Sequence, residues 1–192
     1  MNLPNKLTMF RIFMIPVFML LLIFRNATGG YTAPTGIVSG TTISWLQVIA
    51  MVVFAVASAT DWLDGHIARA RHLVTNFGKF ADPLADKMLT MTAFIFLVSL
   101  NLAPAWVVAI IVCRELAVTG LRLIVVENDG EVIAAKMPGK IKTTAQMLSI
   151  IFLLVGDPWY IGTVLLYVAL VFAIYSGYDY FHSSWGVFKG SM

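Results

Sequence analysis

Four aspartates in the stretch "DWLDGHIARARHLVTNFGKFADPLADK" (61–87) have the type and spacing that suit binding of metal ions. Asp61 and Asp64 are three residues apart, and Asp82 and Asp86 are four apart. On a helix, both spacings place two side chains on one face, so two adjoining helices could direct four carboxylates into one pocket. Four ionised carboxylates at close range need cations beside them, because like charges disfavour the ionised state. We therefore predict a site for hard divalent ions such as Mg²⁺, Mn²⁺ or Ca²⁺.

The residues between the aspartates suit a phosphate-containing ligand. Two metal ions close together steady the attacking and leaving oxygens of a phosphoryl displacement. Gly65 and Ala68 lack bulk, so a nucleotide could come close to the helix, and the planar guanidinium of Arg69 matches phosphate oxygens. The alternative is that the charges only cap helices and pair with one another, and Asp82 before Pro83 resembles a helix N-cap. Acidic residues in membrane-spanning segments usually have a function, which favours the metal site.

The remainder of the chain has the composition of a membrane protein. Of its 192 residues, 59% are hydrophobic and 12% are charged, whereas a soluble domain has about 25% charged residues. Six segments approach the roughly 20 apolar residues that a spanning helix needs: 8–26, 43–64, 84–102, 105–127, 141–156 and 160–182. We predict one all-α domain over residues 1–192, a polytopic membrane protein with six transmembrane helices. The single cysteine, Cys113, excludes an intramolecular disulfide and is expected to pack in the interior.

The basic residues predict how the helices are oriented. They lie before the first segment or at its start, in the second and fourth connections, and in the tail: Lys6, Arg11, Arg69, Arg71, Lys79, Lys87, Lys136, Lys140, Lys142 and Lys189. The opposite loops contain no Lys or Arg, and only Arg25 stands at their edge. By the positive-inside rule, both termini and the aspartates are cytoplasmic. This topology explains the positive net charge without a nucleic-acid partner.

The fourth segment indicates an anionic second substrate. Its stretch "CRELAVTGLRL" places Arg114, Glu115 and Arg122 in or near the bilayer, where charge is costly unless it is paired. Glu115 can fully neutralise only one arginine, so one positive charge remains for an anionic substrate.

A divalent-cation transporter is the alternative to an enzyme that uses the aspartate site. A transporter would need acidic residues toward the outer face, and Asp157 is the only acidic residue clearly on that side.

The motif resembles the signature of the CDP-alcohol phosphotransferase family without one departure: Asp61-x-x-Asp64-Gly65-x-x-Ala68-Arg69, eight residues, Gly78-x-x-x-Asp82-x-x-x-Asp86. The resemblance implies an integral membrane enzyme, typically a homodimer of six-helix protomers. Such enzymes transfer a phosphatidyl or related group from a CDP-linked donor to an alcohol and release CMP. It also implies that the four aspartates bind two Mg²⁺ or Mn²⁺ ions and that Asp86 accepts the proton of the attacking hydroxyl.

Further donor contacts follow from the same resemblance. "LPNKLTMFRI" (3–12) resembles the amphipathic lead-in that helps to cover the nucleotide, although its polar residues would also suit helix capping. The residues expected to contact the donor are Asn5, Thr8, Gly65, Ala68, Arg69 and Thr75.

"CRELAVTGLR" (113–122) and "GKIKTTAQM" (139–147) resemble one branch of the family most, the bacterial phosphatidylglycerophosphate synthases. That branch implies CDP-diacylglycerol as donor, sn-glycerol 3-phosphate as acceptor, and the bacterial cytoplasmic membrane as location. The residues expected to bind the acceptor are Arg114, Arg122, Lys136, Lys140 and Lys142, although loop lysines near anionic lipid also serve topology alone. Phosphatidylglycerol, serine and an inositol phosphate remain alternative acceptors.

Overall fold

The computed structural model describes residues 3–32, 42–71, 76–127 and 137–183, without the side chains of residues 3–7, 61–83 and 123–127. Its elements are α1 (Leu3–Ile23), η1 (Arg25–Ala27), β1 (Gly30–Thr32), β2 (Thr42–Ser44), α2 (Trp45–Arg71), α3 (Asn76–Ser99), α4 (Ala105–Glu127), α5 (Met137–Leu154), η2 (Pro158–Tyr160) and α6 (Ile161–Ser183). The prediction of an all-α fold with six long helices is confirmed.

The helices α2 and α3 are longer than the apolar segments that predicted them. The backbone of α2 stays helical to Arg71 and that of α3 begins at Asn76, so all four motif aspartates lie on helical backbone. Asp82 therefore lies inside α3 and is not its N-cap, which corrects the structural alternative offered for that residue. The charged motif lowers the hydropathy of these ends, but most of its residues are compatible with a helix.

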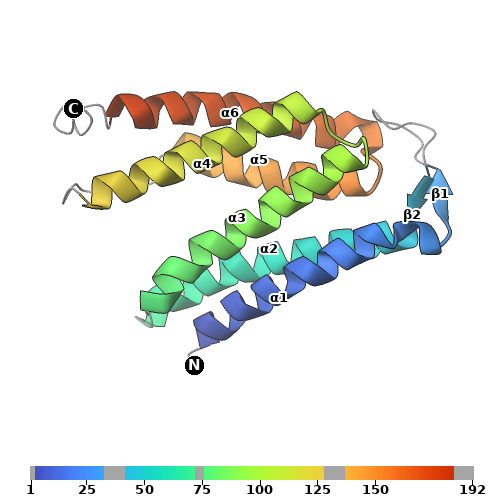
Figure 1. Cartoon of the computed structure of the whole chain (residues 1–192), viewed down its shortest axis with the longest axis horizontal. Helices are drawn as coiled ribbons and strands as arrows, with labels where there is room; N and C mark the ends of the chain where they lie inside the picture. The colour runs from blue at the N-terminus through green and yellow to red at the C-terminus, as the bar shows by residue number, and fades with distance from the viewer. Residues whose placement is uncertain (1–2, 33–41, 72–75, 128–136, 184–192) are drawn as a thin grey trace.

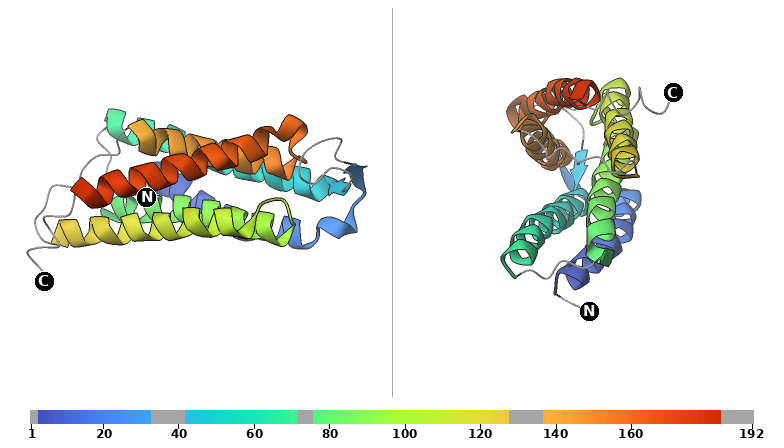
Figure 2. Two further views of the ribbon diagram at one scale, coloured as in Figure 1. Left: turned by 90° about the horizontal axis from the view of Figure 1, so that it is seen from above. Right: turned by 90° about the vertical axis from the view of Figure 1, so that its left-hand side faces the viewer.

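The six helices run alternately between two ends of the molecule. The starts of α1, α3 and α5 and the ends of α2, α4 and α6 lie at one end (Figure 1). The two strands and the short turns after α3 and α5 lie at the other end (Figures 1 and 2). Helix α1 packs against α2 and α3, while α6 packs against α4 and α5. The main core between them consists of buried apolar side chains, among them Phe18, Phe54, Leu97, Ile111 and Leu166.

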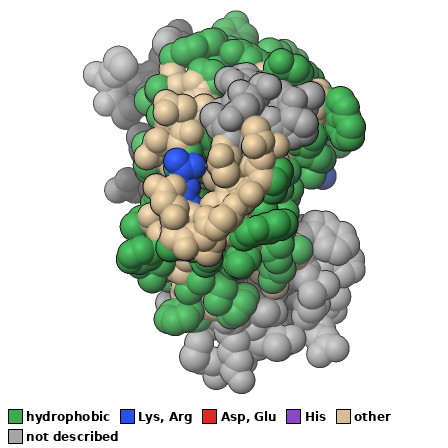
Figure 3. All heavy atoms as spheres, turned by 90° about the vertical axis from the view of Figure 1, so that its right-hand side faces the viewer, with side chains coloured by type: hydrophobic (Ala, Val, Ile, Leu, Met, Phe, Trp, Pro, Cys, Tyr) green, Lys and Arg blue, Asp and Glu red, His purple; other side chains and the backbone are tan. Residues whose placement is uncertain are grey.

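The end with the strands has a hairpin that the sequence did not predict. Strands β1 and β2 pair antiparallel, with Tyr31 opposite Ile43. The Tyr31 hydroxyl donates to the Val155 carbonyl at 2.7 Å, and the Gln47 amide donates to the Leu154 carbonyl at 2.9 Å. These bonds satisfy carbonyls that the end of α5 would otherwise leave open, and burial raises the pKa of Tyr31 so that its hydroxyl stays protonated. Figure 3 shows mainly hydrophobic and neutral side chains over this end, with a small basic patch.

One expectation about burial is wrong, and one burial was not predicted. Cys113 is exposed on α4 of the single chain, so it does not pack in the interior. Arg11, assigned to the basic flank of the first segment, is fully buried in α1. The positive charge of Arg11 therefore lies inside the bundle of helices, as well as at the basic end of the first segment.

Among the described residues, one helical stretch, Pro158–Ser183, is both long and apolar enough to cross a membrane. The apolar parts of α1 and α2, Thr8–Ile23 and Trp45–Thr60, are shorter than that criterion requires. The count of six transmembrane helices thus stays a prediction.

Candidate active site

The four motif aspartates are divided between two helices that contact each other. Asp61 and Asp64 lie on α2, and Asp82 and Asp86 lie on α3. Asp86 is the one whose side chain the structure describes, and it is partly buried. Within the described side chains no group of three or more His, Cys, Asp or Glu residues could hold a metal ion, and three of the predicted ligands lie outside that description. The metal site therefore stays a prediction.

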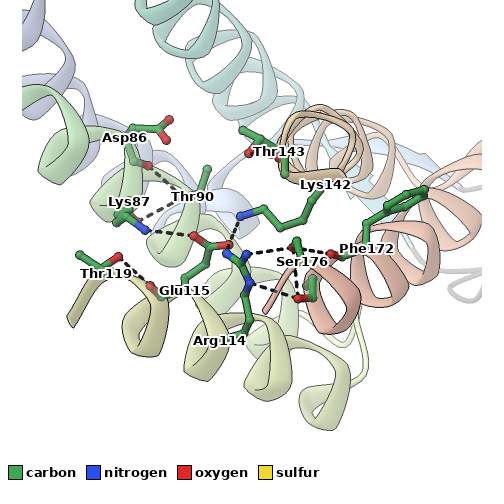
Figure 4. A network of polar contacts seen from close by, with 12 residues as sticks. Asp86, Lys87, Thr90, Arg114, Glu115, Thr119, Lys142, Thr143, Phe172 and Ser176 are labelled. Carbon is green, nitrogen blue, oxygen red and sulfur yellow. Dashed lines mark hydrogen bonds and ion pairs between the residues drawn. The ribbon is translucent and has the colours of Figure 1, made fainter. Parts of the chain in front are cut away.

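Asp86 and Lys87 occupy neighbouring positions on α3 and point in different directions. The hydroxyl of Thr90, one turn later, donates to the backbone carbonyls of Asp86 at 2.9 Å and Lys87 at 3.2 Å. In Figure 4 the ammonium of Lys87 is directed toward Glu115 of α4, while the Asp86 carboxylate is directed away from it. Asp86, the predicted proton acceptor, is therefore next in the chain to Lys87, which belongs to a cluster of charged side chains.

That cluster is centred on Glu115, which contacts three basic side chains from three helices (Figure 4). Lys87 of α3 lies 3.0 Å from Oε2, and Arg114 of α4 lies 3.2 Å from Oε1. The Lys142 ammonium of α5 also pairs with Oε1. We call Lys87, Arg114, Glu115 and Lys142 the charge cluster. The sequence predicted a role for Arg114 and Lys142, but it did not bring Lys87 to Glu115.

Arg114 joins the charge cluster to α6. Its Nε donates to the Ala173 carbonyl at 3.1 Å, and its Nη2 donates to the Ser176 hydroxyl at 2.9 Å. A Cβ at Gly177 would lie 3.2 Å from Arg114 Cγ, so the small residue lets the arginine pass close to α6. With the contact to Glu115, three of the five guanidinium N–H donors are used within the described part of the protein, so Arg114 holds Glu115 against α6, and its contact with the acceptor stays a prediction.

Arg122, two turns further along α4, has a different environment. Its guanidinium carbon lies 5.3 Å from the centre of the Tyr180 ring, a distance suited to a cation–π contact. In the described part of the chain, the buried Nε of Arg122 and the buried hydroxyl of Tyr180 have no hydrogen-bond partner. Arg122 therefore keeps donors for an anion. The contact between Tyr180 and Arg122 was not predicted from the sequence, because an aromatic residue near a helix end is also typical of a membrane anchor.

The remaining predicted site residues are distributed as follows. Lys142 was assigned to the cytoplasmic connection, but it is 5% exposed on α5, whereas Lys140 on the same helix is exposed. Thr8 is fully buried on α1, which packs against both aspartate-bearing helices. Outside the described side chains lie Asn5, Gly65, Ala68 and Arg69, and outside the described residues altogether lie Thr75 and Lys136.

Asp157, the acidic residue of the opposite end, has a structural role. It is fully buried and adopts a left-handed backbone conformation with φ of 54°. Its carboxylate accepts from the Thr163 backbone N–H at 3.1 Å and from the Thr163 hydroxyl. It thereby caps the start of α6, which disfavours the transporter alternative.

Comparison with known proteins gives the same family as the motif. The family model described as CDP-alcohol phosphatidyltransferase matches residues 1–175. The chain is 44% identical to the CDP-diacylglycerol–glycerol-3-phosphate 3-phosphatidyltransferase of Bacillus subtilis (strain 168), over 99% of this chain and 98% of that protein. It is 38% identical to a probable phosphatidylglycerophosphate synthase of Mycobacterium tuberculosis (strain CDC 1551 / Oshkosh), over 93% and 79%. It is 34% identical to a CDP-diacylglycerol–glycerol-3-phosphate 3-phosphatidyltransferase of Shigella flexneri serotype 5b (strain 8401), over 93% and 92%. The resemblance stated from the motif is therefore confirmed, and the chain belongs to the CDP-alcohol phosphatidyltransferase family.

Proposed function

We propose that this protein transfers the phosphatidyl group of CDP-diacylglycerol to sn-glycerol 3-phosphate, giving phosphatidylglycerophosphate and CMP. The names of its relatives support this donor and this acceptor. The observation that carries the proposal is the charge cluster, in which three basic side chains contact one carboxylate among the described residues, because such a cluster suits an anionic acceptor.

The proposed setting is the bacterial cytoplasmic membrane, with six spanning helices and with both termini and the active site on the cytoplasmic side. Every helix exposes large apolar side chains, for example Phe13 (68%), Ile95 (64%) and Val171 (62%). Side chains exposed to this degree suit a lipid environment, and they are unfavourable in water. A homodimer, which the family resemblance implies, is part of the same proposal.

The proposed cofactors are two divalent ions, Mg²⁺ or Mn²⁺, held by Asp61, Asp64, Asp82 and Asp86. The backbone supports this fit, because α2 is helical through the first pair and α3 through the second, so each pair shares a helix face. The donors would all be carboxylate oxygens, which hard cations prefer. When bound, such ions neutralise the diphosphate and stabilise the departing CMP.

The residues of the chain would act as follows. Asp86 accepts the proton of the primary hydroxyl while the hydroxyl oxygen forms a bond to the β-phosphorus of the donor. The bond from that phosphorus to the CMP oxygen breaks, and its electron pair leaves with CMP. General-base help of this kind contributes about 10²- to 10⁴-fold to rate. The basic residues predicted to bind the acceptor, among them Arg122 and Lys142, would hold its phosphate and bring its hydroxyl toward Asp86.

The proposal is tested with purified protein in detergent, by measuring CMP release from CDP-diacylglycerol. Release should require both a divalent ion and sn-glycerol 3-phosphate, and it should need no membrane gradient, which a transporter would use. Serine, phosphatidylglycerol and an inositol phosphate should each give much less CMP. Equal or faster release with one of these acceptors would overturn the assignment of glycerol 3-phosphate.

A further inference from the structure

Arg11 is a buried cation that the proposed mechanism does not use. Its side chain is fully buried in α1, and a guanidinium keeps its charge at physiological pH. A charge inside a bundle of helices is costly unless an anion lies beside it. Arg11 lies on the interior-facing stripe of α1, whose other members follow the same helical repeat and are also buried: Thr8, Ile15, Phe18 and Leu22. Arg11 therefore needs an anion from the helices that cover this stripe.

The helices packed against α1 carry acidic residues of one kind only. Helix α1 packs against α2 and α3. The acidic residues of those two helices are the four motif aspartates: Asp61, Asp64, Asp82 and Asp86. By contrast, Glu115 of α4 already pairs with three basic side chains, and Asp157 caps α6 at the other end of the molecule. The arrangement of the helices thus favours a motif aspartate as the anion beside Arg11.

An aromatic contact between α1 and α2 relates Arg11 to Asp61. The centre of the Phe18 ring lies 6.0 Å from the centre of the Phe54 ring on α2. Arg11 is seven residues before Phe18, and Asp61 is seven residues after Phe54. Because α1 and α2 run in opposite directions (Figure 1), both steps of two turns, about 10 Å, lead toward the same end. Arg11 and Asp61 therefore occupy the same level on neighbouring helices.

A second aromatic contact relates Arg11 to α3. The centre of the Phe18 ring lies 6.3 Å from the centre of the Phe96 ring, and α3 runs in the same direction as α1 (Figure 1). Asp86 is ten residues before Phe96, so its backbone lies one turn, about 5 Å, beyond the level of Arg11. Both contacts thus place Arg11 at the depth of the predicted metal ligands.

We propose that Arg11 is a permanent counter-ion of the aspartate site: its guanidinium pairs with Asp61 and holds α1 against α2 and α3 while no metal ion is bound. A divalent ion that binds the aspartates adds a second source of positive charge, so the protein depends less on Arg11 once the ion is present. Arg11 is a positioning residue, since it acts through the Asp61 carboxylate. This inference rests on the proposed metal site and adds the residue that compensates its charge in the metal-free protein.

The test measures thermal unfolding of the full-length protein in detergent, once with EDTA and once with saturating Mn²⁺. In EDTA, Arg11→Met should lower the melting temperature by about 6 °C or more, because it leaves a buried carboxylate unpaired. In Mn²⁺ this deficit should shrink, since the bound ion supplies the missing charge. Arg11→Lys keeps the charge and should retain most of the wild-type melting temperature in EDTA. Ile15→Ala, one turn further along α1, is the matched control: it removes apolar packing alone and should lower the melting temperature equally in both conditions.

A double variant identifies the partner of Arg11. Arg11→Met and Asp61→Asn should each lower the melting temperature in EDTA, whereas the double variant leaves neither charge unpaired and should unfold at a higher temperature than Arg11→Met. The inference is wrong if the two single effects simply add in the double variant, or if the deficit of Arg11→Met is the same in EDTA and in Mn²⁺; the proposed function then stands. A wild type whose melting temperature does not respond to Mn²⁺ would instead count against the proposed metal site, and the double variant would still decide the pairing of Arg11.

Discussion

The ammonium of Lys87 on α3 lies 3.0 Å from Oε2 of Glu115 on α4, and this pair connects the helix of the predicted proton acceptor to the helix that carries Arg114 and Arg122. In the proposed reaction the donor would lie beside the aspartates of α2 and α3, and the acceptor would lie between α3, α4 and α5, next to the donor. Each residue in this arrangement has a distinct expected effect.

Replacing Asp86 tests the proton acceptor. Asp86→Asn keeps the shape of the side chain but removes the base and weakens a predicted metal ligand, so kcat should fall by at least about 10²-fold. The KM for glycerol 3-phosphate should change far less, because the Asp86 carboxylate is directed away from Glu115 (Figure 4). Steady-state CMP release measures both constants. A variant with wild-type kcat would rule out Asp86 as the base.

Replacing Asp61 tests the metal site on α2. Asp61→Asn removes a predicted ligand, and charge stabilisation is a large contribution to phosphoryl transfer, so activity should fall at least as far as in Asp86→Asn. The concentration of Mg²⁺ or Mn²⁺ needed for half-maximal activity of any residual enzyme should rise. The measurement is a metal titration of CMP release. Unchanged metal dependence would contradict the assignment of Asp61 as a ligand.

Arg114 and Arg122 should differ although they lie on the same helix. Arg114→Met breaks the bonds to Ala173 and Ser176, so it should lower the melting temperature clearly. Arg122→Met removes the cation–π contact with Tyr180 but no hydrogen bond found in the described part of the protein, so it should lower the melting temperature less than Arg114→Met does while raising the KM for glycerol 3-phosphate. Thermal unfolding and acceptor kinetics are measured on both variants. The reverse order of melting temperatures would contradict the division between anchor and binding residue.

Asp157 should matter for stability and not for chemistry. Asp157→Ala removes the cap of α6 and leaves the Thr163 N–H without its acceptor, at a cost of about 0.5–2 kcal/mol in the free energy of unfolding. Thr163→Val removes only the hydroxyl donor and is the milder comparison. Denaturation curves in detergent give the stability, and CMP release should stay near the wild-type rate in both variants. A large loss of activity in stably folded Asp157→Ala would indicate a functional role at this end of the molecule.

The sequence predicted the helices better than their ends. The apolar segments, separated by proline and glycine, predicted the approximate positions of all six helices, because a long run of apolar residues is a strong signal for a helix. The ends of α2 and α3 were missed, since the motif that extends them to Arg71 and back to Asn76 is polar. The β1–β2 hairpin was missed because its strands are three residues each and carry no clear alternation of apolar and polar side chains.

The sequence predicted only those parts of the site that follow from the spacing of residues along one helix. The helix repeat pairs Asp61 with Asp64, and Arg114 is next to Glu115 simply because the two residues are consecutive in the chain. Which residues of α3 and α5 meet Glu115 depends on how those helices are rotated against α4, and packing decides this. The contacts of Lys87 and Lys142 with Glu115 therefore required the structure.

The central claim is that this chain joins glycerol 3-phosphate to a lipid-linked phosphoryl group. The most direct test follows radiolabelled sn-glycerol 3-phosphate into the lipid phase in the presence of CDP-diacylglycerol, the purified protein and Mg²⁺ or Mn²⁺. The predicted result is a labelled phosphatidylglycerophosphate formed in equal amount to CMP. Label that stays in the aqueous phase while the folded, metal-supplied protein is present would contradict the claim.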